Sequence, residues 1–213
     1  MKITRIEPMV IKLTQRWQYG WHGLISPIGH YVILRIETDE GIVGLGEAPV
    51  LPDWGGEHHR YYGEDPVTAV HVMNEYLWPI LEGADPLDIA PLLKRLDAPL
   101  RGHMSAKSAV DLALHDIAGK AMGVPVYKLL GGAMTKKIPV CHSVGIASPE
   151  EAAEEVAGAV ADGVMAMQVK VDGDPDVDVE VIAACRARVG DGIALNPDIN
   201  IGYSTVKEAI GVA

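Results

Sequence analysis

The sequence predicts an α+β domain followed by an α/β domain that contains a parallel sheet. Three observations support this fold class. Strand patterns gather in the first third of the chain, Ala-rich segments with helical spacing fill the middle, and strand and helix patterns alternate after residue 135. Strand–helix units of about 25–30 residues are typical of right-handed βαβ crossovers. The boundary between the two domains is therefore expected between residues 125 and 136.

The first domain begins with three strand patterns. They cover residues 2–13, 30–38 and 42–48. The sequence TDEG at 38–41 is a hairpin turn in which Gly41 supplies a positive φ, so we expect a three-stranded antiparallel meander. The segments 14–29 and 49–65 are long and rich in Gly, Pro, Trp, Tyr and His, which favours functional loops over disorder.

Helical patterns fill the rest of the first domain. Apolar residues recur at helical spacing in residues 66–80 and 87–97. The Ala-rich stretch 105–123 favours a helix whose small residues let it pack closely against its neighbours. Gly123 and Pro125 are expected to end that helix, and a short helical turn, VYKLLGG, follows it.

The second domain alternates strands and helices. Strands are expected at 137–145, 165–171 and 192–198, and helices at 148–163, 175–189 and from 204. The first of these helices carries the clearest start signal, because Ser148 is a good N-cap, Pro149 suits the first helical position and Glu151 completes a capping box. Three parallel strands with their helices are therefore predicted.

Composition and charge narrow the class of protein. With 48% apolar and 22% charged residues the chain is typical of a soluble globular protein, and its net charge of −11 argues against a nucleic-acid partner. A small anionic substrate stays compatible, because local charge in a site can oppose the net charge. The chain shows no signal-peptide core and no apolar run of the roughly 20 residues that cross a bilayer, so we expect a cytoplasmic protein without a membrane partner. Cys141 and Cys185 are expected to be buried, reduced thiols.

Two ionisable residues stand where strands of the second domain end. The alternation in residues 165–171 places Gln168 and Lys170 on the side opposite the apolar positions Met165, Met167, Val169 and Val171. Asp198 ends the next strand, and Asn200 follows it. Parallel strands gather chemistry at their carboxyl ends, which would make Lys170 a base beside a metal-binding Asp198. On spacing alone the alternative is equally weighted: Lys170 extends its ammonium to solvent and Asp198 caps a turn.

Longer motifs resemble a known family over nearly the whole chain. The stretch AKSAVDLALHDIAGKAMGVPVYKLLGG at 106–132 carries small residues, two acids, Gly-Lys, a proline and Leu-Leu-Gly in the order of a family signature helix. The opening MKITRIEPMVIKL, the hairpin LRIETDEGIVGLGEA and the pieces QVKV and DIN also fall in that family's order. The chain thus resembles the enolase superfamily, in its mandelate racemase/muconate lactonizing enzyme branch. The resemblance implies an α+β capping domain at 1–130 and, at 131–213, the first three βα units of a (β/α)8-type (TIM-like) barrel.

The resemblance also implies a reaction and roles for four residues. The family removes a proton α to a carboxylate and stabilises the enediolate with Mg²⁺, because a side-chain base needs a cation to offset the developing charge. Lys170 matches the second lysine of the family's Lys-x-Lys motif, an acid/base on one face of the substrate. Asp198 matches the first of three carboxylate ligands of the metal, and Asn200 matches a supporting asparagine. Gln168, which we expect to act in catalysis together with Lys170, departs from the family, since it stands where the first lysine of the motif often stands.

Polar and aromatic residues near the barrel mouth are candidates for binding the substrate. In this family the capping-domain loops close over the mouth, and here those loops carry Tyr19, Trp21, His22 and Trp54. Aromatic rings there would enclose a ring or a quaternary ammonium group, and packing beneath the loops is the alternative role. His142 falls late in the first barrel strand, where a polar contact to substrate is expected.

The resemblance favours racemisation or epimerisation of an amino-acid-like or other small carboxylate. Within the family the alternative is a dehydratase or cycloisomerase of an acid-sugar or muconate-like substrate, and outside it a non-catalytic truncated remnant. A complete barrel has eight βα units in about 250 residues, and three are visible here. We therefore expect a truncated chain that is inactive by itself, since the second and third metal ligands and a second base are missing. The full-length protein is expected to be a homo-oligomer.

Overall fold

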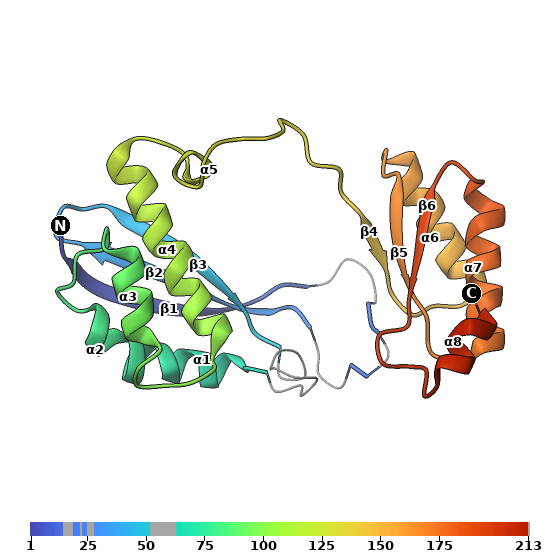
Figure 1. The fold of residues 1–213 in the computed structure, drawn as a ribbon, viewed down its shortest axis with the longest axis horizontal. Coiled ribbons are helices and arrows are strands. Elements are labelled where there is room, and N and C mark those ends of the chain that lie inside the picture. Colours follow the sequence, from blue (N-terminus) through green and yellow to red (C-terminus); the bar gives the residue numbers. More distant parts are fainter. Residues whose placement is uncertain (15–18, 22, 25–27, 52–62, 213) are drawn as a thin grey trace. The chain divides into compact units, whose positions relative to one another are not determined.

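The computed structural model of the chain describes residues 1–14, 19–21, 23–24, 28–51 and 63–212. The chain divides into two compact units (Figure 1). The first unit comprises Met1–Thr14 with Ser26–Met134, and the second comprises Gln15–Ile25 with Thr135–Ala213. Each unit has a three-stranded sheet and a buried hydrophobic cluster of its own. The described part of the chain contains no helix that is both long enough and apolar enough to span a membrane.

The sheet of the first unit is the predicted antiparallel meander. Its strands, in spatial order, are β1 (Ile3–Lys12), β2 (His30–Thr38) and β3 (Val43–Pro49). Gly41 has a φ of +77° in the turn between β2 and β3, which is the left-handed conformation expected of a glycine there. Alternation holds along β2, where Val32, Leu34 and Ile36 are fully buried and the residues between them are partly exposed.

Helices follow the sheet in the order that the sequence predicts, with one irregularity. They are α1 (Pro66–Val72), η1 (Met73–Leu77), α2 (Trp78–Leu81), α3 (Ile89–Leu96), α4 (Met104–Met122) and α5 (Val126–Leu129). The helix expected over 66–80 contains the π-helical segment η1, in which the Trp78 N–H donates to the Met73 carbonyl. Pro79 follows directly and lacks the N–H that would bond to Glu75 in an α-helix, so a wider turn before it relieves the conflict.

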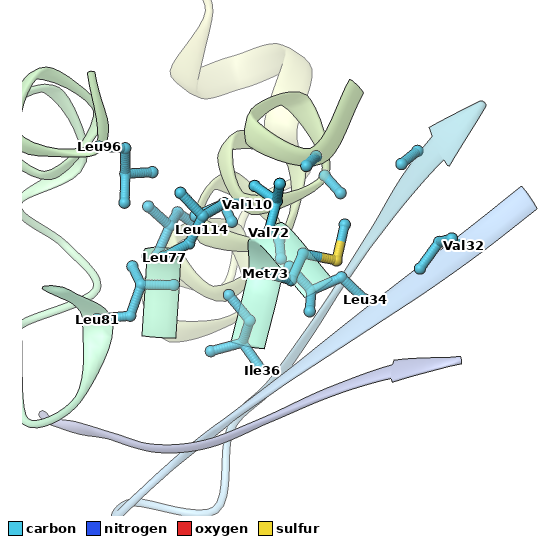
Figure 2. Close-up of a cluster of buried hydrophobic side chains, with 14 of the residues drawn as sticks. Val32, Leu34, Ile36, Val72, Met73, Leu77, Leu81, Leu96, Val110 and Leu114 are labelled. Atoms are coloured by element: carbon cyan, nitrogen blue, oxygen red, sulfur yellow. The ribbon is translucent and has the colours of Figure 1, made fainter. Parts of the chain in front are cut away.

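The core of the first unit lies between β2 and the helices. Figure 2 shows Leu34 and Ile36 of β2 close to Met73, Leu77 and Leu114. The helix α4 also approaches β3 at backbone distance. A Cβ added to Gly46 would lie 1.8 Å from the Ala109 carbonyl oxygen, and one added to Gly44 would lie 2.2 Å from that of Ala113. The small residues of the 106–132 signature therefore allow this close packing of helix on strand.

The second unit has a parallel sheet, as the alternation of strands and helices predicts. Its strands, in spatial order, are β4 (His142–Val144), β5 (Ala166–Lys170) and β6 (Ala194–Asp198). Its helices are α6 (Pro149–Ala161), α7 (Pro175–Val189) and α8 (Val206–Val212). Met167 and Val169 of β5 are fully buried in a cluster with side chains of α6 and α7. The capping box of Ser148 and Glu151 at the start of α6 is present as predicted.

Two expectations about the start of the second unit need correction. The strand predicted over 137–145 is confined to β4, because Ile138 and Val140 are 81% and 67% exposed and pairing with β5 starts only at His142. An apolar alternation does not form a strand without a neighbouring strand to receive its backbone hydrogen bonds. Cys141 is exposed rather than buried, whereas Cys185 is buried as expected, and both are free thiols.

Candidate active site

Lys170 and Asp198 lie side by side at the carboxyl ends of β5 and β6. The register pairs these two residues directly across the parallel ladder. The Lys170 Nζ lies 2.7 Å from the Asp198 Oδ2, and Lys170 is only 7% exposed. A charge-assisted contact of this kind satisfies an ammonium that burial has removed from water. The structure thus brings together the two residues on which the sequence-based interpretation depends.

Asp198 accepts hydrogen bonds from three groups. Its Oδ2 accepts from Lys170 Nζ and also from Gln168 Nε2 at 2.8 Å, and its Oδ1 accepts from the Asn200 backbone N–H at 2.8 Å. Burial by itself raises the pKa of Asp198. The hydrogen bonds from Lys170, Asn200 and Gln168, together with the ammonium charge, outweigh burial, and the pKa lies below its usual value. Asp198 is therefore a carboxylate at neutral pH.

A second pair of polar residues extends this group toward the N-terminal part of the chain. Ser143 lies beside Gln168 in the register of β4 and β5, and its Oγ donates to Gln168 Oε1 at 2.9 Å. The Tyr19 hydroxyl lies 2.7 Å from the same Ser143 Oγ. The Ile146 N–H donates to the Gly20 carbonyl at 3.0 Å, which holds the tyrosine's segment near the end of β4.

The structure does not bring every predicted substrate-binding residue to this group. His142 precedes Ser143 and points to the opposite face of β4, where its Nε2 lies 2.8 Å from Glu155 Oε1 on α6. Trp21 packs edge-on against Tyr19, with ring centroids 5.9 Å apart. His22 and Trp54 lie outside the described residues. Sequence reasoning missed Ser143, although the strand alternation that separates it from His142 was the available signal.

A buried carboxylate on α7 fixes the loops that follow β5 and β6. Asp178 is 1% exposed and accepts from the backbone N–H groups of Asp172 and Gly173 and from the Tyr203 hydroxyl at 2.7 Å. Burial and the neighbouring Asp178 raise the pKa of Tyr203, so it stays a protonated donor. Gly173 has a φ of +92° and lies against the backbone of Gly202, so a side chain there would separate the loops. Lys170 and Asp198 precede these loops directly.

The donor set at the strand ends suits a hard cation only in part. Asp198 supplies one carboxylate, and the Oδ1 of Asn200 is buried without a hydrogen-bond partner, which leaves a second oxygen available. Among the described residues no three His, Cys, Asp or Glu side chains gather as a metal cluster. Mg²⁺ requires near-octahedral oxygen ligation. Asp198 therefore fits as one ligand of a site that needs further oxygens.

Here an α+β domain precedes a parallel sheet that carries a lysine and a carboxylate at the carboxyl ends of its strands. This arrangement is typical of the class of proteins that carry out chemistry at the ends of barrel strands. Residues 27–131 match the family model for the mandelate racemase/muconate lactonizing enzyme N-terminal domain. The chain belongs to the mandelate racemase/muconate lactonizing enzyme family of the enolase superfamily. The predicted fold, a capping domain followed by the start of a barrel, is confirmed.

Curated relatives and solved structures agree with this assignment. N-succinyl-L-Arg/Lys racemase of Bacillus cereus is 36% identical over 95% of this chain and 53% of its own length. Cis-3-hydroxy-L-proline dehydratase of Roseibium aggregatum is 34% identical over 98% of this chain and 56% of its own. The crystal structure of a dipeptide epimerase from Cytophaga hutchinsonii, complexed with Mg and D-Ala-L-Val, matches with 32% identity and a TM-score of 0.85 over 100% of this chain and 55% of that one. The chain thus spans about half the length of these relatives.

Proposed function

We propose that the protein to which this chain contributes is a Mg²⁺-dependent racemase or epimerase of a small, amino-acid-like carboxylate, either N-acylated or a dipeptide. The observation that carries the proposal is the buried contact of 2.7 Å between Lys170 Nζ and Asp198 Oδ2 at the strand ends. The family supports the reaction type, since its members similar to this chain include racemases, epimerases and cycloisomerases. The names of the racemase and dipeptide epimerase relatives support the substrate class.

In this proposal the Nζ atom of Lys170 accepts the α-proton of the substrate. To accept this proton, Lys170 must present a neutral amine to the substrate, and the side chain is largely shielded from water. Asp198, and with it the free oxygen of Asn200, would hold the cation. When bound, Mg²⁺ supplies the positive charge that offsets the negative charge developing on the substrate carboxylate. Gln168 fixes the orientation of the Asp198 carboxylate through its hydrogen bond.

A dehydratase is the second candidate function, because the Roseibium aggregatum dehydratase is nearly as similar as the Bacillus cereus racemase. Both reactions begin by removing a proton next to a carboxylate, so Lys170 would serve either. They differ in the product: racemisation returns the substrate with inverted configuration, whereas dehydration releases water and leaves a double bond. The product spectrum therefore separates the two candidates.

The test follows exchange of the substrate α-proton in deuterated water by NMR. The enzyme is a chain that continues residues 1–213 with the remaining barrel of the Bacillus cereus racemase, and the substrates are N-succinyl amino acids and dipeptides. We expect exchange of the α-proton and inversion of the α-carbon, both of which require Mg²⁺ and both of which are lost in Lys170→Ala. Lys128→Ala, which alters an exposed lysine over the Tyr127 ring in the first unit, is the control and should keep the parent rate. Equal exchange in parent and Lys170→Ala would refute the role of the lysine.

A further inference from the structure

Four side chains form a continuous hydrogen-bonded chain from the N-terminal segment of the second unit to the candidate metal ligand. This series of hydrogen bonds links Tyr19 to Ser143 at 2.7 Å, Ser143 to Gln168 at 2.9 Å and Gln168 to Asp198 at 2.8 Å. The geometry leaves the donor of the first of these contacts undecided, because either hydroxyl can donate. The chemistry of the other members decides it.

The direction of the chain is set at Asp198. A carboxylate only accepts hydrogen bonds, so the Gln168 amide must turn its NH₂ group toward Asp198 and its carbonyl oxygen toward Ser143. The Ser143 hydroxyl has one proton, and this proton goes to the Gln168 oxygen. Ser143 can then only accept from Tyr19, so the Tyr19 hydroxyl is the donor. Its proton is committed inward, and the phenolic oxygen keeps only lone pairs for other contacts.

The position of Tyr19 is fixed as well as its polarity. The backbone hydrogen bond from Ile146 to Gly20 holds Gly20, the residue after Tyr19, near the end of β4. The Trp21 ring packs edge-on against the Tyr19 ring. The phenolic oxygen is thereby held in place, and the side chains of Ser143 and Gln168 link it to the Asp198 carboxylate. A ligand bound at Lys170 and Asp198 and large enough to reach Tyr19 meets a fixed hydrogen-bond acceptor.

The residue at position 168 controls this polarity. Lysine, which the family often carries there, has only donors. A lysine would donate to Ser143 as well as to Asp198, the serine proton would turn toward Tyr19, and the tyrosine proton would become free to face a ligand. Glutamine and lysine at this position therefore give Tyr19 opposite hydrogen-bonding characters.

We propose that Tyr19 is a specificity-determining residue that accepts a hydrogen bond from a substrate N–H, and that Gln168 is the positioning residue that sets this polarity through Ser143. The proposal rests on the proposed function, which supplies an N-acylated or dipeptide substrate whose amide N–H matches an acceptor. A substrate that presents a carboxylate oxygen at this place would meet lone pairs and be disfavoured. Tyr19 selects the substrate, while Lys170 carries out the chemistry.

The first experiment reads the polarity without any turnover. The Fermi doublet of tyrosine in the Raman spectrum distinguishes a donating phenol from an accepting one, and the difference spectrum between the 213-residue chain and its Tyr19→Phe variant isolates Tyr19. We expect a donating phenol in the parent and an accepting phenol in Gln168→Lys. If Gln168→Lys does not fold, Ser143→Ala takes its place and should abolish the donor signature. An accepting phenol in the parent overturns the proposal whatever the enzyme does.

The second experiment compares a dipeptide with its depsipeptide, in which an ester oxygen replaces the amide N–H. In the completed enzyme, α-proton exchange should favour the amide by about tenfold in KM, the value of one ordinary hydrogen bond. Tyr19→Phe and Gln168→Lys should remove this preference, while Tyr76→Phe, a tyrosine in the first unit, should keep it. An equal preference in parent and Tyr19→Phe overturns the substrate contact. Exchange with neither compound contradicts the proposed function, and the Raman result still decides the polarity of Tyr19.

Discussion

At the scale of single residues, the candidate site depends on one carboxylate that several donors share. Asp198 takes hydrogen bonds from a lysine, an amide side chain and a backbone N–H, and these bonds keep it ionised against the effect of burial. Lys170 in turn has its charge satisfied by Asp198. Removing Asp198 would leave the buried Lys170 ammonium without this partner, which costs more than an exposed ion pair contributes. Removing Lys170 would leave Asp198 with its hydrogen bonds from Gln168 and Asn200.

Replacing Asp198 by Asn should therefore be felt at Lys170 and at Gln168. The neutral amide keeps the shape but weakens both hydrogen bonds, so we expect a loss of about 1–3 kcal/mol in the stability of the second unit at pH 7. The lowered pKa of Asp198 gives a sign to the pH dependence. The stabilisation is complete above the unfolded value near 3.9 and disappears as pH falls through the folded value. Urea unfolding at pH 7 and pH 2 measures both; an equal difference at the two pH values would contradict this account.

At the scale of elements, the start of α1 shows how a single cap fixes a helix. Asp65 accepts from the Thr68 N–H at 2.6 Å, and Pro66 occupies the first helical turn. The hydrogen bond from Thr68 lowers the pKa of Asp65. Asp65→Ala should destabilise the first unit by about 1 kcal/mol at pH 7. The difference should vanish below the folded pKa, because the protonated side chain no longer favours the helix N-terminus. Thermal unfolding of the parent and of Asp65→Ala across pH 2–7 tests this.

The packing of α4 on β3 gives a sharper prediction. Gly46→Ala puts a methyl group 1.8 Å from the Ala109 carbonyl oxygen, so strand and helix must separate, at a cost of about 3 kcal/mol or more. Gly158→Ala is the matched change within α6, where an added Cβ meets nothing within 4 Å. It should stabilise the second unit by about 0.5–1 kcal/mol, because alanine has the higher helix propensity. Chemical denaturation of the parent and of each variant measures the two changes in unfolding free energy. A tolerated Gly46→Ala would show that α4 does not approach β3 as closely as described.

At the scale of the whole molecule, the part of the chain that the structure describes offers one candidate carboxylate ligand at the strand ends for a cation that needs several oxygens. We predict that residues 1–213 bind Mg²⁺ no more tightly than an exposed aspartate does. Isothermal titration calorimetry measures the affinity, with Asp198→Asn as the matched control that should change it little. Tight, stoichiometric Mg²⁺ binding by residues 1–213 would mean that a ligand set exists in this chain beyond the residues described here.

The sequence by itself determined most of the elements and predicted the central pair of the candidate site. Periodicity fixed the helix over 175–189 and the capping box at Ser148, because both signals are local and no distant contact competes with them. The rule that parallel strands gather chemistry at their carboxyl ends, together with the family resemblance, led to Lys170 and Asp198, because each stands at the end of its own strand pattern.

Only the tertiary structure decided what depends on register and on segments distant along the chain. Ser143 rather than His142 joins the candidate site, since pairing with Gln168 selects one face of β4 and leaves the histidine on the other face, in contact with Glu155 of α6. Tyr19 reaches Ser143 across 124 positions of sequence, a contact that no local pattern encodes. A periodic pattern says which residues share a face, whereas the identity of the neighbouring face comes from the fold, and the polarity of Tyr19 follows from that neighbour.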